Sequence, residues 1–100
     1  MSGVNQPFGT FYETVAASQT AQVLGVTGAA GDTLMRLVIT VSTAASSTVA
    51  LLDNATSYPL MAANTPIGVY DIEIGVVSVS GAWKITTGAG ASVLAVGNFT

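Results

Sequence analysis

Short runs in which apolar and polar residues alternate recur along the chain, and a period of two is the pattern of a β-strand with one buried face. The clearest example is VYDIEIGVVSVSGAWKITT, residues 69–87, which also holds the only tryptophan. The positions that alternation places inward are Tyr70, Ile72, Ile74, Trp83 and Ile85. We therefore expect this stretch to supply two strands and the tryptophan to belong to the core.

A turn-forming pair, Ser80-Gly81, separates the two halves of that stretch, so the sequence predicts an antiparallel hairpin. In such a hairpin Lys84 lies on the same face as Asp71 and Glu73. An ion pair between neighbouring strands contributes about 0.2–1 kcal/mol, which favours one register but does not hold a fold.

The longest run rich in β-branched residues is TLMRLVITVST, residues 33–43. We expect Met35, Leu37, Ile39 and Val41 on one face and Arg36, Val38, Thr40 and Ser42 on the other. Shorter strands are predicted within residues 21–27, 48–52, 58–61 and 92–99, with a second hairpin closed by residues 88–91. Pro59 lacks a backbone N–H, which confines its strand to a sheet edge.

These runs amount to about eight strands, at spacings of roughly 8–12 residues and without an amphipathic helix. The predicted fold class is all-β: a single-domain antiparallel β-sandwich, jelly-roll-like, with about eight short strands. An incomplete barrel is the main competing architecture. A chain of 100 residues is one domain, and we expect its sandwich over residues 21–100.

The first twenty residues are less regular, and they bring together three of the seven aromatic residues, Phe8, Phe11 and Tyr12. We interpret residues 1–20 as a first strand with a loose lead-in or as an arm that docks on a neighbouring subunit, since termini are poorly ordered unless something ties them down. These three aromatics are our predicted contact residues, toward a capsid or a sister subunit.

Charged residues make up only 7% of the chain. The surface of a soluble monomer usually carries about 25–35%, so this chain lacks the groups that keep a small domain soluble and alone. We expect sister subunits, in a homo-oligomer, or a larger partner to cover its apolar surface.

The same composition argues against binding to nucleic acid and against insertion into a membrane. A net charge of −3 with two basic residues provides no cluster to bind nucleic acid. No uninterrupted run of about 18 apolar residues is present to cross a membrane, and the N-terminus does not resemble a secretory signal. The absence of cysteine fits folding in a reducing cytoplasm.

The chain contains neither histidine nor cysteine, which excludes histidine-based triads, thiolate nucleophiles and the usual zinc and haem sites. Asp71 and Glu73 are the best carboxylate pair, but neighbours on one strand face are more simply a solvated surface. Residues 53–57 lack the acids of a calcium loop, and the glycines of residues 88–90 serve a turn. We therefore expect no enzyme activity, no cofactor and no metal.

Aromatic side chains also bind sugars by stacking, and Trp83 with Tyr58 and Tyr70 would form such a platform if exposed. Because alternation places Trp83 and Tyr70 inward, packing in the core is the favoured interpretation. Sugar binding stays open as the second.

Two segments resemble small structural proteins of tailed bacteriophages, the head decoration or cement proteins: MRLVITVSTAASSTVALLDNATSYPL and GVYDIEIGVVSVSGAWKITTGAGASVLAVGNFT. The resemblance covers roughly residues 31–100, and its most recognisable pieces are GAWK and TGAG. It implies a non-enzymatic protein, made in the host cytoplasm, that assembles as a homo-oligomer, a trimer or dimer, on the outside of the capsid. There it would bridge neighbouring major capsid proteins and stabilise the shell.

Two other functions stay open from the sequence. A head-fibre or tail-fibre module that binds host glycans needs an exposed aromatic platform. A bacterial scaffold or surface-assembly protein would be distinguished by the genes that neighbour its own.

Overall fold

The computed structural model describes residues 10–100, which form strands joined by turns and loops. The strands are β1 (Thr10–Val15), β2 (Gln22–Val23), β3 (Thr33–Val41), β4 (Val49–Asp53), β5 (Thr56–Met61), β6 (Gly68–Val77), β7 (Trp83–Thr86) and β8 (Ala91–Phe99).

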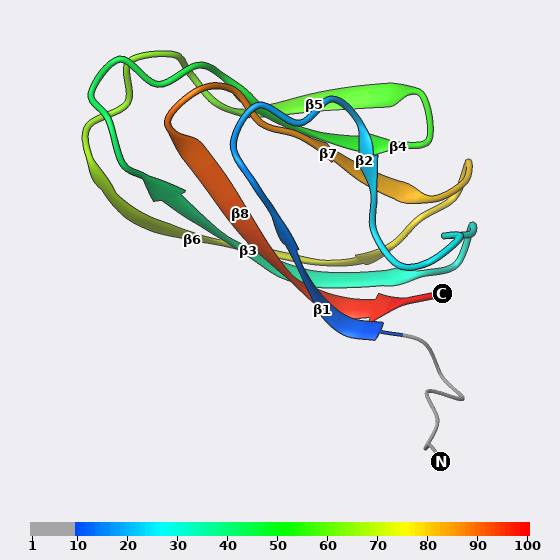
Figure 1. The fold of residues 1–100 in the computed structure, drawn as a ribbon. Helices are drawn as coiled ribbons and strands as arrows, with labels where there is room; N and C mark the ends of the chain where they lie inside the picture. Colours follow the sequence, from blue (N-terminus) through cyan, green and yellow to red (C-terminus); the bar gives the residue numbers. More distant parts are fainter. Residues whose placement is uncertain (1–9) are drawn as a thin grey trace.

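The strands form two four-stranded sheets that lie face to face (Figure 1). One sheet has the order β1-β8-β3-β6 and the other has the order β2-β7-β4-β5, and every pair is antiparallel. The first strand therefore pairs with the last, β2 with β7, β3 with β6 and β4 with β5. This nesting is a jelly roll: an antiparallel ribbon rolled up so that its alternate strands fall in opposite sheets. The all-β, jelly-roll-like sandwich predicted from the sequence is confirmed.

The ribbon turns back on itself at the β4–β5 hairpin. Asp53 pairs with Thr56, which leaves Asn54 and Ala55 to make the turn. Asn54 has a φ of 57°, a left-handed conformation that asparagine tolerates better than most residues. As Pro59 predicts, β5 lies at the edge of its sheet.

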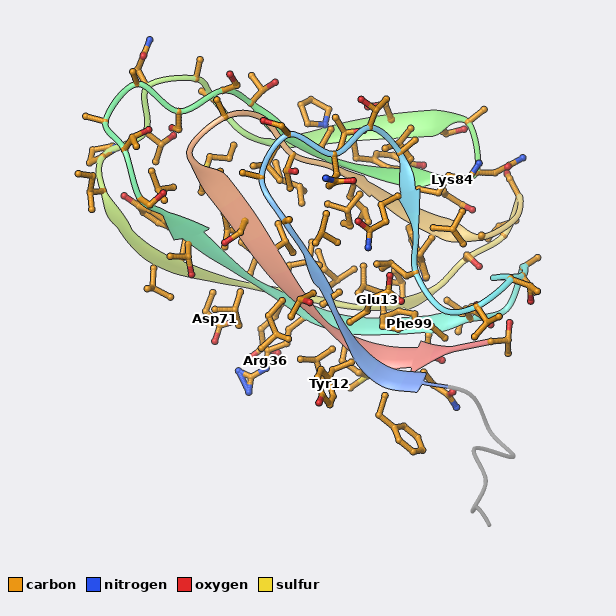
Figure 2. All side chains as sticks on the ribbon, viewed as in Figure 1. Tyr12, Glu13, Arg36, Asp71, Lys84 and Phe99 are labelled. Carbon is orange, nitrogen blue, oxygen red and sulfur yellow. The ribbon has the colours of Figure 1, made fainter. Side chains whose placement is uncertain are left out.

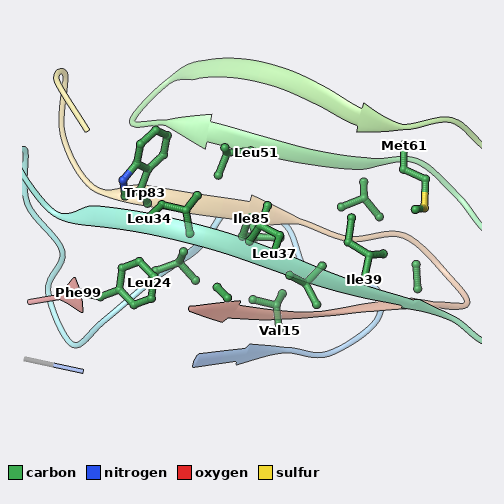
Figure 3. Close-up of a cluster of buried hydrophobic side chains, with 14 of the residues drawn as sticks. Val15, Leu24, Leu34, Leu37, Ile39, Leu51, Met61, Trp83, Ile85 and Phe99 are labelled. Carbon is green, nitrogen blue, oxygen red and sulfur yellow. The ribbon is translucent and has the colours of Figure 1, made fainter. Parts of the chain in front are cut away.

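The core lies between the two sheets and is formed by the side chains that alternate along each strand toward the opposite sheet (Figure 3). β8 shows the pattern most clearly, because Ala91, Val93, Ala95 and Phe99 are buried while the residues between them are more exposed. Trp83 is only 4% exposed, and its indole Nε1 donates a hydrogen bond to the carbonyl oxygen of Asp32 at 2.8 Å. The inward position predicted for this tryptophan is confirmed.

The predicted hairpin over residues 69–87 is wrong. β6 pairs with β3 in one sheet, whereas β7 pairs with β2 and β4 in the other, so this stretch crosses between the sheets. The crossing is held by Asp53, whose carboxylate accepts hydrogen bonds from the backbone N–H groups of Val79 and Ser80 at 3.0 and 3.1 Å. Alternation had identified the inward residues but carries no information about which strand lies alongside.

The predicted ion pair of Lys84 fails for the same reason. Lys84 lies opposite Leu52 and Val23 in the second sheet. The cation beside Asp71 is Arg36 of the adjacent strand β3, whose Nη1 lies 2.9 Å from Asp71 Oδ2.

The second predicted hairpin, at residues 88–91, is also wrong: β7 and β8 lie in different sheets, and β8 pairs with β1 and β3. The short strand predicted within residues 21–27 is reduced to β2, two residues long.

One face of β3 differs from its prediction because of an irregularity in pairing. Leu37, Ile39 and Val41 are buried as expected, but Met35 is 52% exposed and Leu34 is buried in its place. The register shifts between Leu34 and Arg36 against both neighbouring strands. A β-bulge reverses the in-and-out alternation beyond it, and simple period-two counting cannot foresee one.

Candidate interaction surfaces

Three of the five acidic side chains serve the fold at the loops. Asp32, 5% exposed, accepts hydrogen bonds from the N–H groups of Ala29 and Thr100, both at 3.1 Å. Glu13 accepts one from the N–H of Gly25 at 2.7 Å and one from the Gln22 side chain at 2.8 Å, and Asp53 holds the crossing after β6. Backbone amides thus occupy these carboxylates, which makes them structural acceptors.

The outer face of the β1-β8-β3-β6 sheet carries an uncharged stripe. Cross-strand registers align Tyr12 with Val96 and then Arg36, and the next row aligns Thr14 with Leu94 and then Val38. We call Tyr12, Thr14, Leu94, Val96 and Val38 the outer stripe. Its three aliphatic members are half-buried by one another, and Tyr12 is 64% exposed. In Figure 2 Tyr12 points away from the second sheet.

Charge on this outer face is confined to one side. Arg36, Asp71 and Glu73 lie on β3 and the edge strand β6. The hydrogen bond and the charge of Asp71 raise the pKa of the Arg36 guanidinium further above its already high value. The two side chains of this ion pair are 48% and 49% exposed, so water screens the attraction. The outer stripe beside them contributes no charge of either sign.

Two of the three predicted contact residues fall within the described chain. Phe11 and Tyr12 lie next to each other on β1, and they are 56% and 64% exposed. Phe8 lies outside the described residues, as does most of the predicted arm. Sequence reasoning missed Leu94, Val96 and Val38, although the run over 92–99 and the outer face of 33–43 contained them.

A second apolar surface lies where the sandwich is open, between the edge strands β5 and β6. Leu51, Asp53 and Trp83 line this groove, and Asp53 is its one charged residue. The rest of the lining comes from both edge strands and the following loop: Tyr58, Leu60, Ile74, Val76, Val77 and Val79. Val76, Val77 and Val79 are 49%, 52% and 79% exposed. We call this surface the β5/β6 groove. Its exposed valines extend the core to the surface.

The aromatic residues do not form a stacked platform. Trp83 is buried, and Tyr70 is half-buried with its hydroxyl donating to the carbonyl oxygen of Pro66 at 2.7 Å. Tyr58 is the exposed member of the three, at 49%. A sugar ring would therefore meet one tyrosine at the mouth of the β5/β6 groove.

No group of three or more acidic, histidine or cysteine side chains within residues 10–100 is arranged to hold a metal ion. The same residues contain no helix of the length and apolar character needed to cross a membrane.

Comparison of the chain with protein-family models, with curated proteins and with solved structures finds no match.

Proposed function

We propose that this protein is a non-enzymatic structural protein of a tailed-bacteriophage virion. In this proposal it is made in the host cytoplasm, assembles as a dimer or trimer and decorates the outer surface of the capsid. It binds the major capsid protein and stabilises the shell. The resemblance of residues 31–100 to decoration proteins supports the proposal, and the jelly-roll sandwich is compatible with it, since one fold serves many functions.

The observation that carries the proposal is the outer stripe. An ordinary monomer surface intersperses charges of both signs, whereas this stripe has no charged side chain on β1 or β8 and meets charge on β3 only at Arg36, which is paired with Asp71. Surfaces that become buried in assemblies lose charged residues at their centre and gain aromatic ones. Tyr12 supplies the aromatic component, so the surface has the composition of an interface.

Stabilisation of the shell follows from multivalency. An oligomer that holds several copies of the outer stripe at fixed spacing contacts several capsid subunits at once. Each contact after the first forms at high effective concentration, so weak individual contacts add up to strong attachment. Of the predicted contact residues, Tyr12 belongs to the stripe, Phe11 precedes it on β1 and Phe8 lies outside the described residues.

The first test is the composition of the virion. Mass spectrometry of purified particles of the phage that encodes this chain should find the protein at a fixed stoichiometry to the major capsid protein. Size-exclusion chromatography with light scattering should give a dimer or trimer. Absence from purified virions would refute the proposal, and a 10.0 kDa monomer that responds to added glycans would favour the fibre module instead.

A matched pair of variants then tests the surface. Leu94 and Leu52 are both half-buried leucines on the outside of the sandwich, but they lie on opposite sheets. Leu94→Gln should weaken co-sedimentation with undecorated capsids by at least about fivefold, because burying an unpaired amide at an interface costs about 1–3 kcal/mol. Leu52→Gln should leave capsid binding unchanged. Equal effects of the two substitutions would contradict the role of the outer stripe.

A further inference from the structure

The edge strand β6 offers another chain a place to pair. It hydrogen-bonds to β3 on one side, and six consecutive residues, from Gly68 to Glu73, pair in regular register. The N–H and C=O groups on its other side face outward, as on any edge strand. From this geometry we propose that β6 accepts an extended segment of another protein, in which apolar residues alternate with basic ones.

The other three edges are less suited to a new strand. β2 is two residues long, and β5 contains Pro59 and a register shift between Val49 and Ala50 of its partner. The pairing of β1 with β8 is interrupted between Thr10 and Tyr12, which leaves four regular pairs. Short length, proline and bulges are the features by which natural sheets prevent edge pairing. β6 has the longest uninterrupted edge, before its own bulge at Gly75.

The inner face of β6 explains the apolar half of the proposed segment. Ile72 and Ile74 are half-buried against the core, because no further strand covers them. Beyond Ile74 the β5/β6 groove opens, with Val76 at its rim and Trp83 within its lining. A strand added beside β6 would place every second side chain on the inner face of the sheet, next to Ile72 and Ile74, since side chains alternate across a sheet. Apolar side chains there would extend the core.

The outer face explains the basic half. Asp71 and Glu73 are exposed and stand two residues apart on this face of β6. Arg36 pairs with Asp71, and this is the only salt bridge among residues 10–100. A lysine or arginine on the added strand would lie across from Glu73, and opposite charges in that position stabilise strand pairing.

The same two acids argue against a second copy of β6 as the partner. An antiparallel β6–β6 pair centred on residue 71, 72 or 73 places an acid directly opposite an acid of the other copy. Like charges in that position destabilise a sheet. The preferred partner is therefore a different, basic segment. This inference does not depend on the proposed capsid role, because the edge recognises backbone and charge whatever the source of the chain.

The test uses the full chain and two acetylated and amidated peptides, Ser-Lys-Val-Lys-Val-Thr and Ser-Glu-Val-Glu-Val-Thr. Amide hydrogen exchange measured by NMR should show that the lysine peptide protects amides within residues 68–74. The glutamate peptide should bind about three- to tenfold more weakly. Binding is measured up to about 1 mM peptide, the weak end of specific association.

Two single-charge variants separate pairing at β6 from general attraction between opposite charges. Glu73→Gln and Thr20→Lys each raise the net charge by one, but Thr20 is exposed just before β2, the edge strand at the far end of the other sheet from β5. Glu73→Gln should reduce the preference for the lysine peptide about two- to fivefold, and Thr20→Lys should leave it unchanged. No protection of β6 at the highest concentration, protection elsewhere only, or equal effects of the two variants would each overturn the proposal.

Discussion

Asp32 is the buried acid on which most of one end of the sandwich depends. Its carboxylate accepts hydrogen bonds from the N–H groups of Ala29 and Thr100 and from the Thr100 hydroxyl, all at 3.1–3.2 Å. Its carbonyl oxygen accepts bonds from the Trp83 indole and the Ser78 N–H. One residue thus joins the loop before β3, the end of β8 and the core tryptophan. We predict that Asp32→Asn lowers stability measurably although it preserves the size of the side chain.

The magnitude follows from the geometry of the acceptors. Both backbone N–H groups donate to the same carboxylate oxygen, Oδ2, and the Thr100 hydroxyl reaches either oxygen. An asparagine that places its one side-chain oxygen at the Oδ2 position keeps both N–H bonds, and its amide nitrogen can donate to the Thr100 hydroxyl, which also accepts. The charge is what is lost, and each of the two N–H bonds weakens by about 1 kcal/mol when its acceptor becomes neutral. We expect a total loss of about 1–2 kcal/mol, a substantial share of the roughly 5–15 kcal/mol that stabilises a domain.

The assay is urea unfolding followed by Trp83 fluorescence and by circular dichroism. The control is Glu73→Gln, which removes the same charge from an exposed position on β6 and should change stability by less than about 0.5 kcal/mol. A loss below about 0.5 kcal/mol for Asp32→Asn, or equal losses for both variants, would refute the reasoning. The first result would mean that a neutral amide serves the same donors as well as the carboxylate does, and the second that net charge governs stability.

Three further substitutions test other features of the structure, each by the same unfolding assay. Ser46→Ala should raise stability by up to about 1 kcal/mol, because the Ser46 hydroxyl is buried without a hydrogen-bond partner; a loss would mean that the hydroxyl is satisfied. Gly97→Ala should cost at least about 2 kcal/mol, since its methyl group would collide with the backbone carbonyl oxygen of Thr33, and a tolerated alanine would contradict the close approach of β8 to β3. Arg36→Ala should leave the unfolding midpoint unchanged because its ion pair with Asp71 is exposed; a clear decrease would show that the pair matters to the fold.

The sequence was sufficient for the fold class because the signal for a strand is local. Alternation identified Trp83, Ile85 and three of the four residues expected on the inner face of β3, and Pro59 placed β5 at an edge. Alternation did not predict which strands pair with each other. In a jelly roll, most strands that follow one another along the chain lie in opposite sheets, so the hairpins expected at residues 69–87 and 88–91 do not form.

The candidate surfaces were less predictable than the fold, and for the same reason. The outer stripe joins Tyr12, Leu94, Val96 and Val38 from three strands that are distant in sequence. No local pattern indicates that these residues meet, and half-buried aliphatic positions resemble core positions when only hydropathy is considered. Phe11 and Tyr12 were selected from the sequence because three of the seven aromatic residues lie close together there. Their neighbours required knowledge of which strands pair.

The few charged residues of this chain are unevenly distributed over the fold, which composition alone does not show. All seven charged residues lie within residues 10–100. Of the five acids, Glu13, Asp32 and Asp53 are occupied by hydrogen bonds at the loops, whereas Asp71 and Glu73 are exposed, Asp71 in its ion pair with Arg36. Both lie on one edge strand, beside Arg36. The outer face of one sheet therefore carries its charges at the β6 edge and an uncharged stripe on the other side, so the two surfaces are suited to different partners and can be tested independently.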